Sequence, residues 1–371
     1  MARRPSRRAR VGQWVLLGVV VTVAWFLVSV AATASVRRHG SFGFGYLADP
    51  TNFDIPFRLI PWAIGDSYGR ALLVCVLNTL LVSAMSIIAA TLLGLLVGIM
   101  RLSTNWLVRN IALGFIELVR NTPQLVQIIF WYVAVLQTLP GPRQSIRLPF
   151  GTLLNIRGLY LPSFIANDLA ATLWPLALAL LVAIPLVWQV RFRGFPLGVK
   201  SLLLVAPALL SFLVGIDHTD RPAMLGFNIA GGVQVVPELV ALWAGLSIYA
   251  AAFIAEIVRA SILSVHKGQR EAALSLGLRP RQVLSKVILP QALRVAVPPT
   301  TSQYLNIIKS SSLGAAVAYP ELYEIFAGTA MMQSNREIES IALLMGVFLT
   351  INLIVSAFMN WYNHRILFVG R

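Results

Sequence analysis

Runs of apolar residues dominate the chain, and their lengths predict helices that cross a membrane. A bilayer core of about 30 Å is spanned by about 20 mostly apolar residues in a helix. The clearest run lies between Arg70 and Arg101, where no charged side chain occurs. The predicted spans are residues 12–34, 72–100, 111–139, 169–190, 201–216, 237–257, 298–318 and 339–361. We therefore expect an all-α, polytopic membrane protein with about eight transmembrane helices.

Two of these spans are weaker than the others because prolines interrupt them. Pro175 and Pro185 fall within residues 169–190, and Pro207 falls within the shorter run 201–216. Proline removes a backbone N–H and kinks or breaks a helix. The two runs fit either two full spans or a re-entrant pair, and we treat them as an inserted helix pair.

The N-terminal run has two interpretations. A basic start, an apolar run and the small residues 32–34 resemble a secretory signal peptide with its cleavage site. The run is longer than the roughly 7–15 residues of a signal core, however, and Arg37 follows it closely. We favour a retained anchor helix, followed by an outside loop at 35–70 with a short surface helix near 57–64.

Composition places the chain among membrane proteins. Hydrophobic residues make up 57% and charged residues 12%, and the mean hydropathy is +0.77. A typical soluble domain carries about 25% charged residues, so an ordinary cytosolic enzyme and a disordered protein are excluded. Cys75 is the only cysteine, which excludes a disulfide scaffold.

The placement of Lys and Arg predicts the orientation. With the N-terminus in the cytoplasm, the inside segments hold 19 basic residues and the outside segments hold 9. Cytoplasmic loops of membrane proteins carry an excess of Lys and Arg. We therefore expect both termini in the cytoplasm, and we attribute the net charge of +16 to topology and not to nucleic-acid binding.

The longest inside segment, residues 258–295, has the pattern of two short helices joined by a glycine. Residues 269–276 are rich in helix formers, and Gly277 fits a helix stop. Pro280 fits the first turn of a second helix, which Pro290 is expected to end. Small residues beside leucines suit a surface that docks into a partner, and an amphipathic helix lying on lipid is the alternative.

The spacing in this segment resembles the EAA loop of ABC importer permeases. In that pattern Glu-Ala-Ala is followed after three residues by Gly, and nine residues later by Ile, one residue and Leu-Pro. This chain departs from the pattern only by a Val in place of the Ile. The matching residues are Glu271, Ala272, Ala273, Gly277, Val287, Leu289 and Pro290. The resemblance implies that they form a coupling helix that contacts a separate ATP-binding subunit.

Further segments resemble the polar amino-acid branch of these permeases and the longer permeases of general L-amino-acid uptake systems. They are residues 78–80, 120–127, 139–143, 155–158, 249–259 and 309–313. The resemblance implies a type I ABC importer permease fold with an extra N-terminal helix and the inserted helix pair. It also implies amino-acid uptake across the bacterial inner membrane by alternating access. The implied partners are a periplasmic substrate-binding protein and a second permease subunit, homologous or identical.

These features give the expected domain organisation. Residues 1–71 would form a cytoplasmic tail, the anchor helix and a periplasmic loop. Residues 72–361 would form the permease domain, with an insertion at about 140–236 and the coupling loop at 258–295. Residues 362–371 would form a cytoplasmic C-terminal tail.

Polar residues within the third span are candidates for the translocation path. An ionisable side chain at membrane depth is costly and usually faces protein or water. Glu117 and Arg120 lie on one helical face, and they form either a structural ion pair or part of the path of a zwitterionic substrate. In the second case Asn121 and Thr122 join them. Pro123 is expected to break the helix there and to free backbone carbonyls.

Lys309 is the second candidate for the path. It lies about eleven residues into its predicted span, and the residues that follow it are Ser310, Ser311 and Ser312. An ammonium group at that depth needs a carboxylate or water. We therefore expect Lys309 to face a cavity, where it contacts a substrate carboxylate or pairs with Glu117 or Glu256.

Other polar and small residues have structural explanations. Glu256 and Arg259 are expected to form an ion pair near the inner end of their span. Glu321 and Glu324, just outside the membrane, either meet a periplasmic partner or are solvated, and we expect them to be solvated. A stripe of small residues at every fourth position from 86 to 98 predicts close helix packing, either within the bundle or with a partner subunit.

The sequence contains no recognisable catalytic pattern. It has no G-x-x-x-x-G-K-[ST] phosphate loop, no H-E-x-x-H and no G-x-S-x-G, and its four histidines are scattered. We expect a transport subunit with no catalytic residue, cofactor or metal, while ATP is hydrolysed in another subunit. The alternatives are a secondary transporter driven by an ion gradient, a membrane-embedded enzyme and a membrane scaffold.

Overall fold

The computed structural model describes residues 7–39, 43–166, 173–174, 206–207, 209–210, 213–214, 216–226 and 228–368. The chain forms two compact units, of which the first combines residues 1–129 with 241–371 and the second is residues 130–240. Apart from isolated positions, the predicted spans 169–190 and 201–216 lie outside the described residues.

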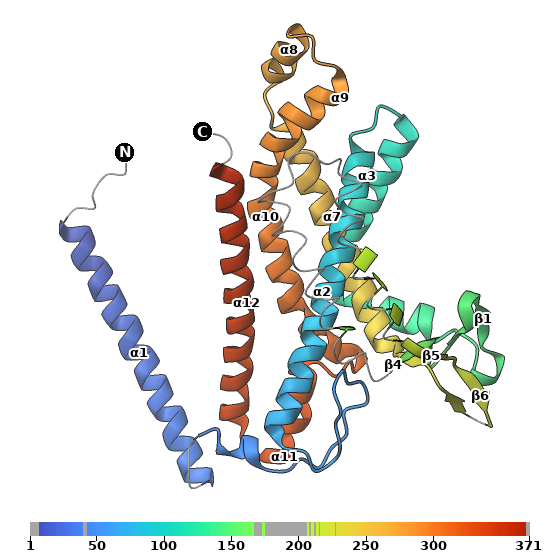
Figure 1. The fold of residues 1–371 in the computed structure, drawn as a ribbon. Coiled ribbons are helices and arrows are strands. Elements are labelled where there is room, and N and C mark those ends of the chain that lie inside the picture. The colour runs from blue at the N-terminus through green and yellow to red at the C-terminus, as the bar shows by residue number, and fades with distance from the viewer. Residues whose placement is uncertain are drawn as a thin grey trace. The chain divides into compact units, whose positions relative to one another are not determined.

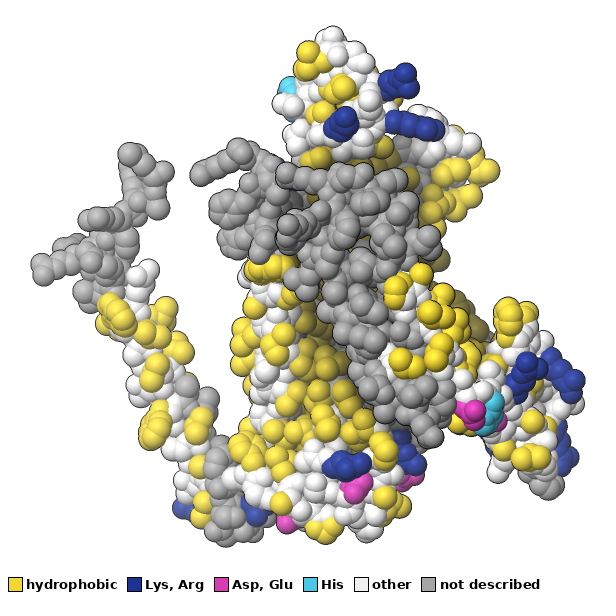
Figure 2. Space-filling model, viewed as in Figure 1, with side chains coloured by type: hydrophobic (Ala, Val, Ile, Leu, Met, Phe, Trp, Pro, Cys, Tyr) yellow, Lys and Arg dark blue, Asp and Glu magenta, His cyan; other side chains and the backbone are white. Residues whose placement is uncertain are grey.

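Four predicted spans are confirmed as helices that are long and apolar enough to cross a membrane. They are α1 (Arg7–His39), α2 (Tyr68–Arg101), α7 (Pro237–Leu263) and α12 (Glu337–Phe368). Ser67 caps the start of α2, where its side chain accepts the backbone N–H of Arg70. Hydrophobic side chains cover the visible flank of the helices in Figure 2, as expected for surfaces that face lipid.

The third predicted span, 111–139, is not one helix. It consists of α3 (Trp106–Arg120), α4 (Gln124–Ile129) and the π-helical η2 (Phe130–Leu136), with a break between α3 and α4. Pro123 lies in this break, as predicted, because it has no N–H for the next turn. The break leaves two shorter segments in place of a continuous span.

The segment before the predicted span 298–318 also differs from the prediction. The second helix of the coupling loop begins at α9 (Pro280–Val283) and continues through the π-helical η5 (Leu284–Ile288) into α10 (Leu289–Ser310). Pro290 therefore does not end the helix. The π-helical turn directly before it shifts the backbone hydrogen-bond pattern, which accommodates a residue that lacks an N–H.

Helices α2, α7 and α10 form the centre of the first unit (Figure 1). The small-residue stripe of α2 packs against α7 within this chain: an added Cβ on Gly94 would lie 2.7 Å from the Cβ of Ile254, and one on Gly98 would lie 2.8 Å from the backbone oxygen of Ala255. The stripe therefore allows close approach of two helices of the bundle, and α10 packs in turn against α12.

Two ends of the first unit are distinct in Figure 1. At one end, α8 (Lys267–Ser275) and α9 project beyond the neighbouring ends of α7 and α10. At the other end lies α11 (Met331–Ser334), which follows η6 (Ser311–Val317) and η7 (Glu324–Ala330).

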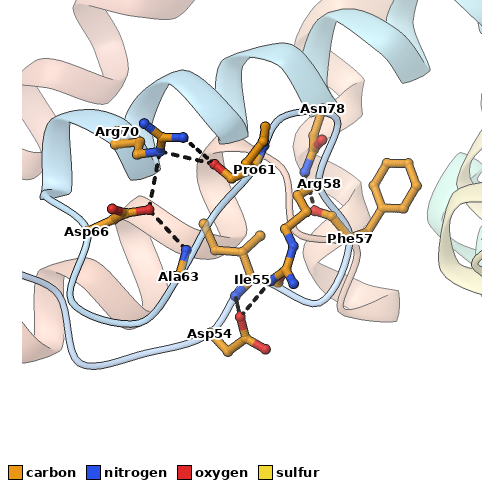
Figure 3. Close-up of polar contacts among 9 residues, drawn as sticks. All are labelled: Asp54, Ile55, Phe57, Arg58, Pro61, Ala63, Asp66, Arg70 and Asn78. Carbon is orange, nitrogen blue, oxygen red and sulfur yellow. Dashed lines mark hydrogen bonds and ion pairs between the residues drawn. The ribbon is translucent and has the colours of Figure 1, made fainter. Parts of the chain in front are cut away.

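The loop before α2 is folded onto the helices. It contains a short 3₁₀ helix, η1 (Gly45–Ala48), and no helix at 57–64, where Pro56 and Pro61 interrupt the backbone pattern. Arg70 donates to the Pro61 oxygen at 2.6 Å and pairs with Asp66 at 3.2 Å (Figure 3). Buried aromatic side chains of this loop, such as Trp62, pack against residues near α11 in one apolar cluster.

The second unit contains β-structure, so the all-α expectation is incomplete. The described strands are β1 (Ile146–Leu148), β2 (Thr152–Asn155), β3 (Gly158–Leu161), β4 (Ser163–Ala166), β5 (Ile216–Asp220), β6 (Ala223–Leu225), β7 (Asn228–Ala230) and β8 (Val233–Val235). They form an antiparallel sheet in the order β1-β2-β3-β8 and two separate antiparallel pairs, β4-β5 between distant segments and the hairpin β6-β7. We call these strands and their turns the β lobe.

Turn chemistry explains the β2–β3 hairpin, which was not predicted from the sequence. The Asn155 side chain accepts the backbone N–H of Arg157, and Gly158 takes a φ of 117°. An Asx turn followed by a glycine is a strong hairpin signal, because glycine adopts positive φ without steric cost. The 3₁₀ turns η3 (Pro142–Gln144) and η4 (Pro149–Gly151) flank β1.

Candidate functional site

The coupling loop forms the predicted helix–glycine–helix. Helix α8 ends at Ser275 with Leu276 as its C-cap, and Gly277 follows with a φ of 77°. The N–H of Gly277 donates to the Leu274 oxygen at 2.9 Å, and the N–H of Leu278 donates to the Ala273 oxygen at 3.2 Å. These two bonds form a Schellman motif, which requires a residue in the left-handed conformation after the helix. The motif fixes the angle between the two helices of the loop.

The residues of the Glu-Ala-Ala motif do not share one environment. Glu271 and Ala272 are exposed, whereas Ala273 is 5% exposed. α8 packs against α9 and η5, where Val283 is also buried. Ala273 therefore belongs to the packing between the two helices, and its small size permits their close approach.

The exposed face of the coupling loop carries apolar side chains. Leu276 is 82% exposed and Leu274 is 41% exposed, next to the open space around Gly277. On the second helix, Val287 is half-buried, and Leu289 and Pro290 are exposed. Exposed leucines at the tip of a rigid element are typical of a surface that docks into a partner.

The break between α3 and α4 is closed by a glutamine side chain. Pro123 has no N–H for the Val119 carbonyl, and the Gln127 amide donates to that oxygen instead, at 2.8 Å. The same amide donates to the Thr122 oxygen at 3.1 Å. These carbonyls are therefore satisfied, and they are not free to line a polar cavity as predicted.

The candidate path residues at the break have different partners from those expected. Glu117 accepts a hydrogen bond from the Asn121 amide at 3.2 Å. The guanidinium carbon of Arg120 lies 5.0 Å from the centre of the Phe253 ring, a cation–π contact. Glu117 and Arg120 thus do not form the ion pair that was one of the two interpretations.

A cavity of about 290 Å³ lies in the first unit beside Arg120 and Lys309. Its lining residues are Gln124, Tyr249, Ala250, Phe253, Gln303, Asn306, Ile307, Lys309 and Ser310. We call it the central cavity. Phe253 lines the cavity and contacts Arg120, whereas Asn121 and Thr122 are not among the lining residues. Lys309 faces the central cavity as expected, and in the described part of the chain it forms no ion pair with Glu117 or Glu256.

The serines after Lys309 serve different purposes. Ser310 lines the central cavity. The hydroxyl of the buried Ser311 donates to the Ile308 oxygen at 2.7 Å, and that of Ser312 donates to the Lys309 oxygen at 2.9 Å. The last two hydroxyls therefore stabilise the transition from α10 to η6 instead of facing the cavity.

Several lining residues were missed by the sequence analysis. Gln303, Asn306 and Ser310 recur at helical spacing, which places polar groups along one face of α10. A polar stripe within an otherwise apolar helix is the signal that would have identified them. Gln124 and Tyr249 belong to segments that were noted only for their resemblance to a family.

Two acidic residues outside the central cavity, Glu256 and Glu321, also had environments predicted from the sequence. Glu256 and Arg259 form the expected ion pair, with two contacts of 2.6 and 2.9 Å. Glu321, in contrast, is fully buried and not solvated. Its carboxylate accepts the backbone N–H groups of Tyr323 and Glu324 at 2.8 and 2.7 Å and so caps the helical segment that follows.

Buried hydrogen bonds hold the capped segment against α2. The Asn78 amide donates to the backbone oxygens of Phe57 and Pro320 at 2.9 and 2.8 Å, and Figure 3 shows the contact with Phe57. The Thr79 hydroxyl accepts the backbone N–H of Leu322 at 3.1 Å. Asn78 thus joins the loop before α2 to the turn after η6.

Comparison with known proteins agrees with this geometry. A profile of the family described as "Binding-protein-dependent transport system inner membrane component" matches residues 90–368. The putative amino-acid ABC transporter permease protein YhdX of Escherichia coli (strain K12) is 44% identical, over 99% of this chain and 96% of that protein. The general L-amino acid transport system permease protein AapQ of Rhizobium johnstonii is 40% identical, over 99% and 94%.

A solved structure supports the fold. The crystal structure of an amino acid ABC transporter with histidines has a TM-score of 0.50, with 19% identity over 80% of this chain and 95% of that chain. The family profile covers most of the chain, and the full-length relatives exceed one third identity. The chain therefore belongs to the family of binding-protein-dependent transport system inner membrane components, the permease subunits of ABC transporters.

Proposed function

We propose that the chain is the subunit through which an ABC importer takes up amino acids, as a general L-amino-acid system, across the bacterial inner membrane. Relatives that match almost its whole length are named as amino-acid permeases. The central cavity agrees with such a substrate, because it offers the Lys309 ammonium to a carboxylate and amide groups such as Gln303 to the polar remainder. Its volume of about 290 Å³ suits a small molecule.

The exposed apolar tip of the coupling loop carries this proposal. Leu276 and the neighbouring Glu271 and Ala272 would enter a cleft of the ATP-binding subunit, while the buried Ala273 would keep the two helices of the loop close together. ATP binding in that subunit would move the loop. α10 continues from the second helix of the loop without interruption, so the movement would reach Lys309 at its other end.

The remaining partners follow from the family. A second permease, homologous or identical, would complete the pore, and a binding protein would deliver the amino acid on the outer side. Both termini and the coupling loop would lie in the cytoplasm. Arg120, Asn121 and Thr122 at the α3–α4 break would then lie along the translocation path, next to the central cavity.

The experiment replaces Leu276 by Asp in the complex reconstituted into proteoliposomes with its ATP-binding subunit. A desolvated carboxylate in an apolar cleft is strongly unfavourable. We therefore expect the ATP-binding subunit to dissociate during purification and ATP-driven uptake to fall by roughly tenfold or more. Insertion of the chain and its thermal stability should remain unchanged, because Leu276 has few contacts within the chain.

Two control variants make the result specific. Leu276→Met keeps an apolar side chain at the tip of the loop and should keep uptake. Met332→Asp is the control for the added charge, because it places the same charge at an apolar position on α11 that is 75% exposed. Normal assembly and uptake in Leu276→Asp would refute the coupling role. Uptake by the wild-type chain without any ATP-binding subunit would instead support the rival function, a secondary transporter.

A further inference from the structure

The β lobe contains a second cavity, of about 530 Å³, that is rich in arginine. Its charged lining residues are Arg143, Arg147 and Arg221, and among the residues that the structure describes no Asp or Glu lines it. We call it the arginine cavity. The apolar part of its wall comes from residues such as Leu148 and Met224. A concave surface with several positive charges and an apolar wall binds anionic groups that bring some apolar surface with them.

The fold of the lobe brings these arginines together from separate turns and strands. Arg143 lies in η3, Arg147 in β1, and Arg221 between β5 and β6. Gly151 takes a φ of 79°, and a Cβ added there would lie 3.4 Å from the Cδ of Arg221. That distance is an ordinary van der Waals contact, so the positive φ and not the space beside Arg221 favours glycine at this position.

The acidic residues of the lobe are engaged elsewhere. Asp217 contacts His218 at 2.8 Å, and Asp220 accepts the Gly232 N–H at 3.0 Å. Glu238, which follows the lobe at the start of α7, accepts the Tyr132 hydroxyl at 3.1 Å. Among the residues that the structure describes, neither Arg147 nor Arg221 takes part in an ion pair. Their guanidinium groups are exposed and keep a planar set of N–H donors that matches a carboxylate in a bidentate manner.

An unusual aromatic residue lies beside the cavity. Phe150 is 91% exposed and has a φ of 63°, a left-handed conformation that costs a non-glycine residue about 1 kcal/mol. Leu225, after Met224, is 68% exposed. Aromatic residues and arginine are enriched at protein–protein interfaces relative to the rest of the protein surface. Figure 2 shows Lys and Arg side chains gathered on the visible face of the lobe beside hydrophobic ones.

We infer that the arginine cavity is a docking site for the substrate-binding protein, whose acidic side chains would enter it from an exposed loop or helix end. This inference rests on the proposed function, since it needs the β lobe on the outer side of the membrane. The concave shape favours a protruding segment of a protein over a flat lipid surface. Paired guanidinium–carboxylate contacts would give the complex its orientation and its fast, salt-dependent association.

The test reverses the charge of the cavity in the complete importer held in lipid nanodiscs. The variant is Arg147→Glu with Arg221→Glu, and the control is Arg157→Glu, which is on the same lobe but outside the cavity lining. Binding of the purified binding protein is measured at about 50 mM and about 300 mM salt, since salt screens exposed charges. We expect the double variant to lower affinity by roughly tenfold or more at low salt and to lose most of the salt dependence, while the control changes affinity by less than about twofold.

The outcomes separate this inference from the proposed function. If the binding protein stimulates ATP hydrolysis equally in the wild type and the double variant, the docking site is refuted and the proposed function stands. If it stimulates neither, the proposed function itself fails. Binding of free glutamate or inorganic phosphate by the wild-type importer alone, abolished in the double variant, would overturn docking in favour of a small-anion site. Loss of binding only in nanodiscs of anionic lipid would assign the arginines to the membrane.

Discussion

Glu321 shows how a single buried carboxylate is stabilised in this fold. Both of its oxygens accept backbone N–H groups, yet the residue is fully buried. Burial disfavours the ionised form more than the two hydrogen bonds favour it, so the pKa of the carboxyl rises to about 7. The other titratable groups that face it are Glu324, the Cys75 thiol and the Tyr319 phenol. The acid form therefore predominates at mildly acidic pH.

This shift predicts a pH-dependent stability that a substitution removes. A raised carboxyl pKa means that the folded chain holds a proton the unfolded chain has released, so stability falls as pH rises from about 4.5 to about 7. In Glu321→Gln this loss should be absent: its amide oxygen accepts only one of the two N–H groups, so its overall stability differs, but its melting temperature in detergent should not fall between about pH 4.5 and pH 7 as that of the wild type does. The exposed Glu271→Gln serves as the control. Identical pH profiles for Glu321→Gln and the wild type would contradict the explanation.

Local residue chemistry was readable from the sequence, whereas burial was not. Pro123 and Gly277 act through their own backbone, so the helix break and the helix stop were predicted correctly. Glu321 was expected to be solvated, because its two N–H partners come from a helical turn that the sequence pattern did not place there. The Gln127 amide that replaces the missing N–H of Pro123 depends likewise on how the chain continues after the break.

At the scale of elements, the close contact of α2 and α7 gives a direct prediction. In Gly94→Ala the new Cβ would lie 2.7 Å from the Cβ of Ile254 and 2.9 Å from the Ala251 oxygen, so the helices must separate. We expect a loss of about 1–3 kcal/mol in unfolding free energy. The control is Gly346→Ala in α12, where nothing lies within 4 Å, and which should be neutral or slightly stabilising. Equal melting temperatures for the two variants would refute close packing at Gly94.

Helix ends were predicted less well than helix cores. The length of the apolar runs identified α2, α7 and α12, because a helix that crosses the membrane must be apolar along most of its length. Pro290 was expected to end a helix by the ordinary rule for proline, and the π-helical η5 overrides this rule. The short strands of the β lobe have no long apolar run. The local sequence signal is the Asx turn at Asn155 with the glycine that follows it, and this signal marks only the β2–β3 hairpin.

At the scale of the molecule, the sequence predicted an insertion at about 140–236 between helical segments, but the β strands that the structure shows there were not predicted. The first unit combines chain segments on both sides of the second, residues 130–240. Long apolar segments predict the helices of the bundle, since a segment of that length has few alternatives to a membrane-spanning helix. The β lobe is held by backbone pairing between distant segments, such as β3 with β8, which no local pattern reveals.

The orientation of the whole molecule can be tested with introduced cysteines, because the one native cysteine, Cys75, is buried and will give little background. Leu276→Cys places a thiol at the tip of the coupling loop and Phe150→Cys at the β lobe, both at highly exposed positions. The excess of basic residues in the predicted inside segments places the loop in the cytoplasm and the lobe outside. A membrane-impermeant maleimide should therefore label Phe150→Cys in spheroplasts and Leu276→Cys only in inverted vesicles. The opposite pattern would reverse the orientation and remove the coupling loop from the ATP-binding subunit. Labelling of both from one side would require an even number of crossings between them, whereas the predicted spans give an odd number.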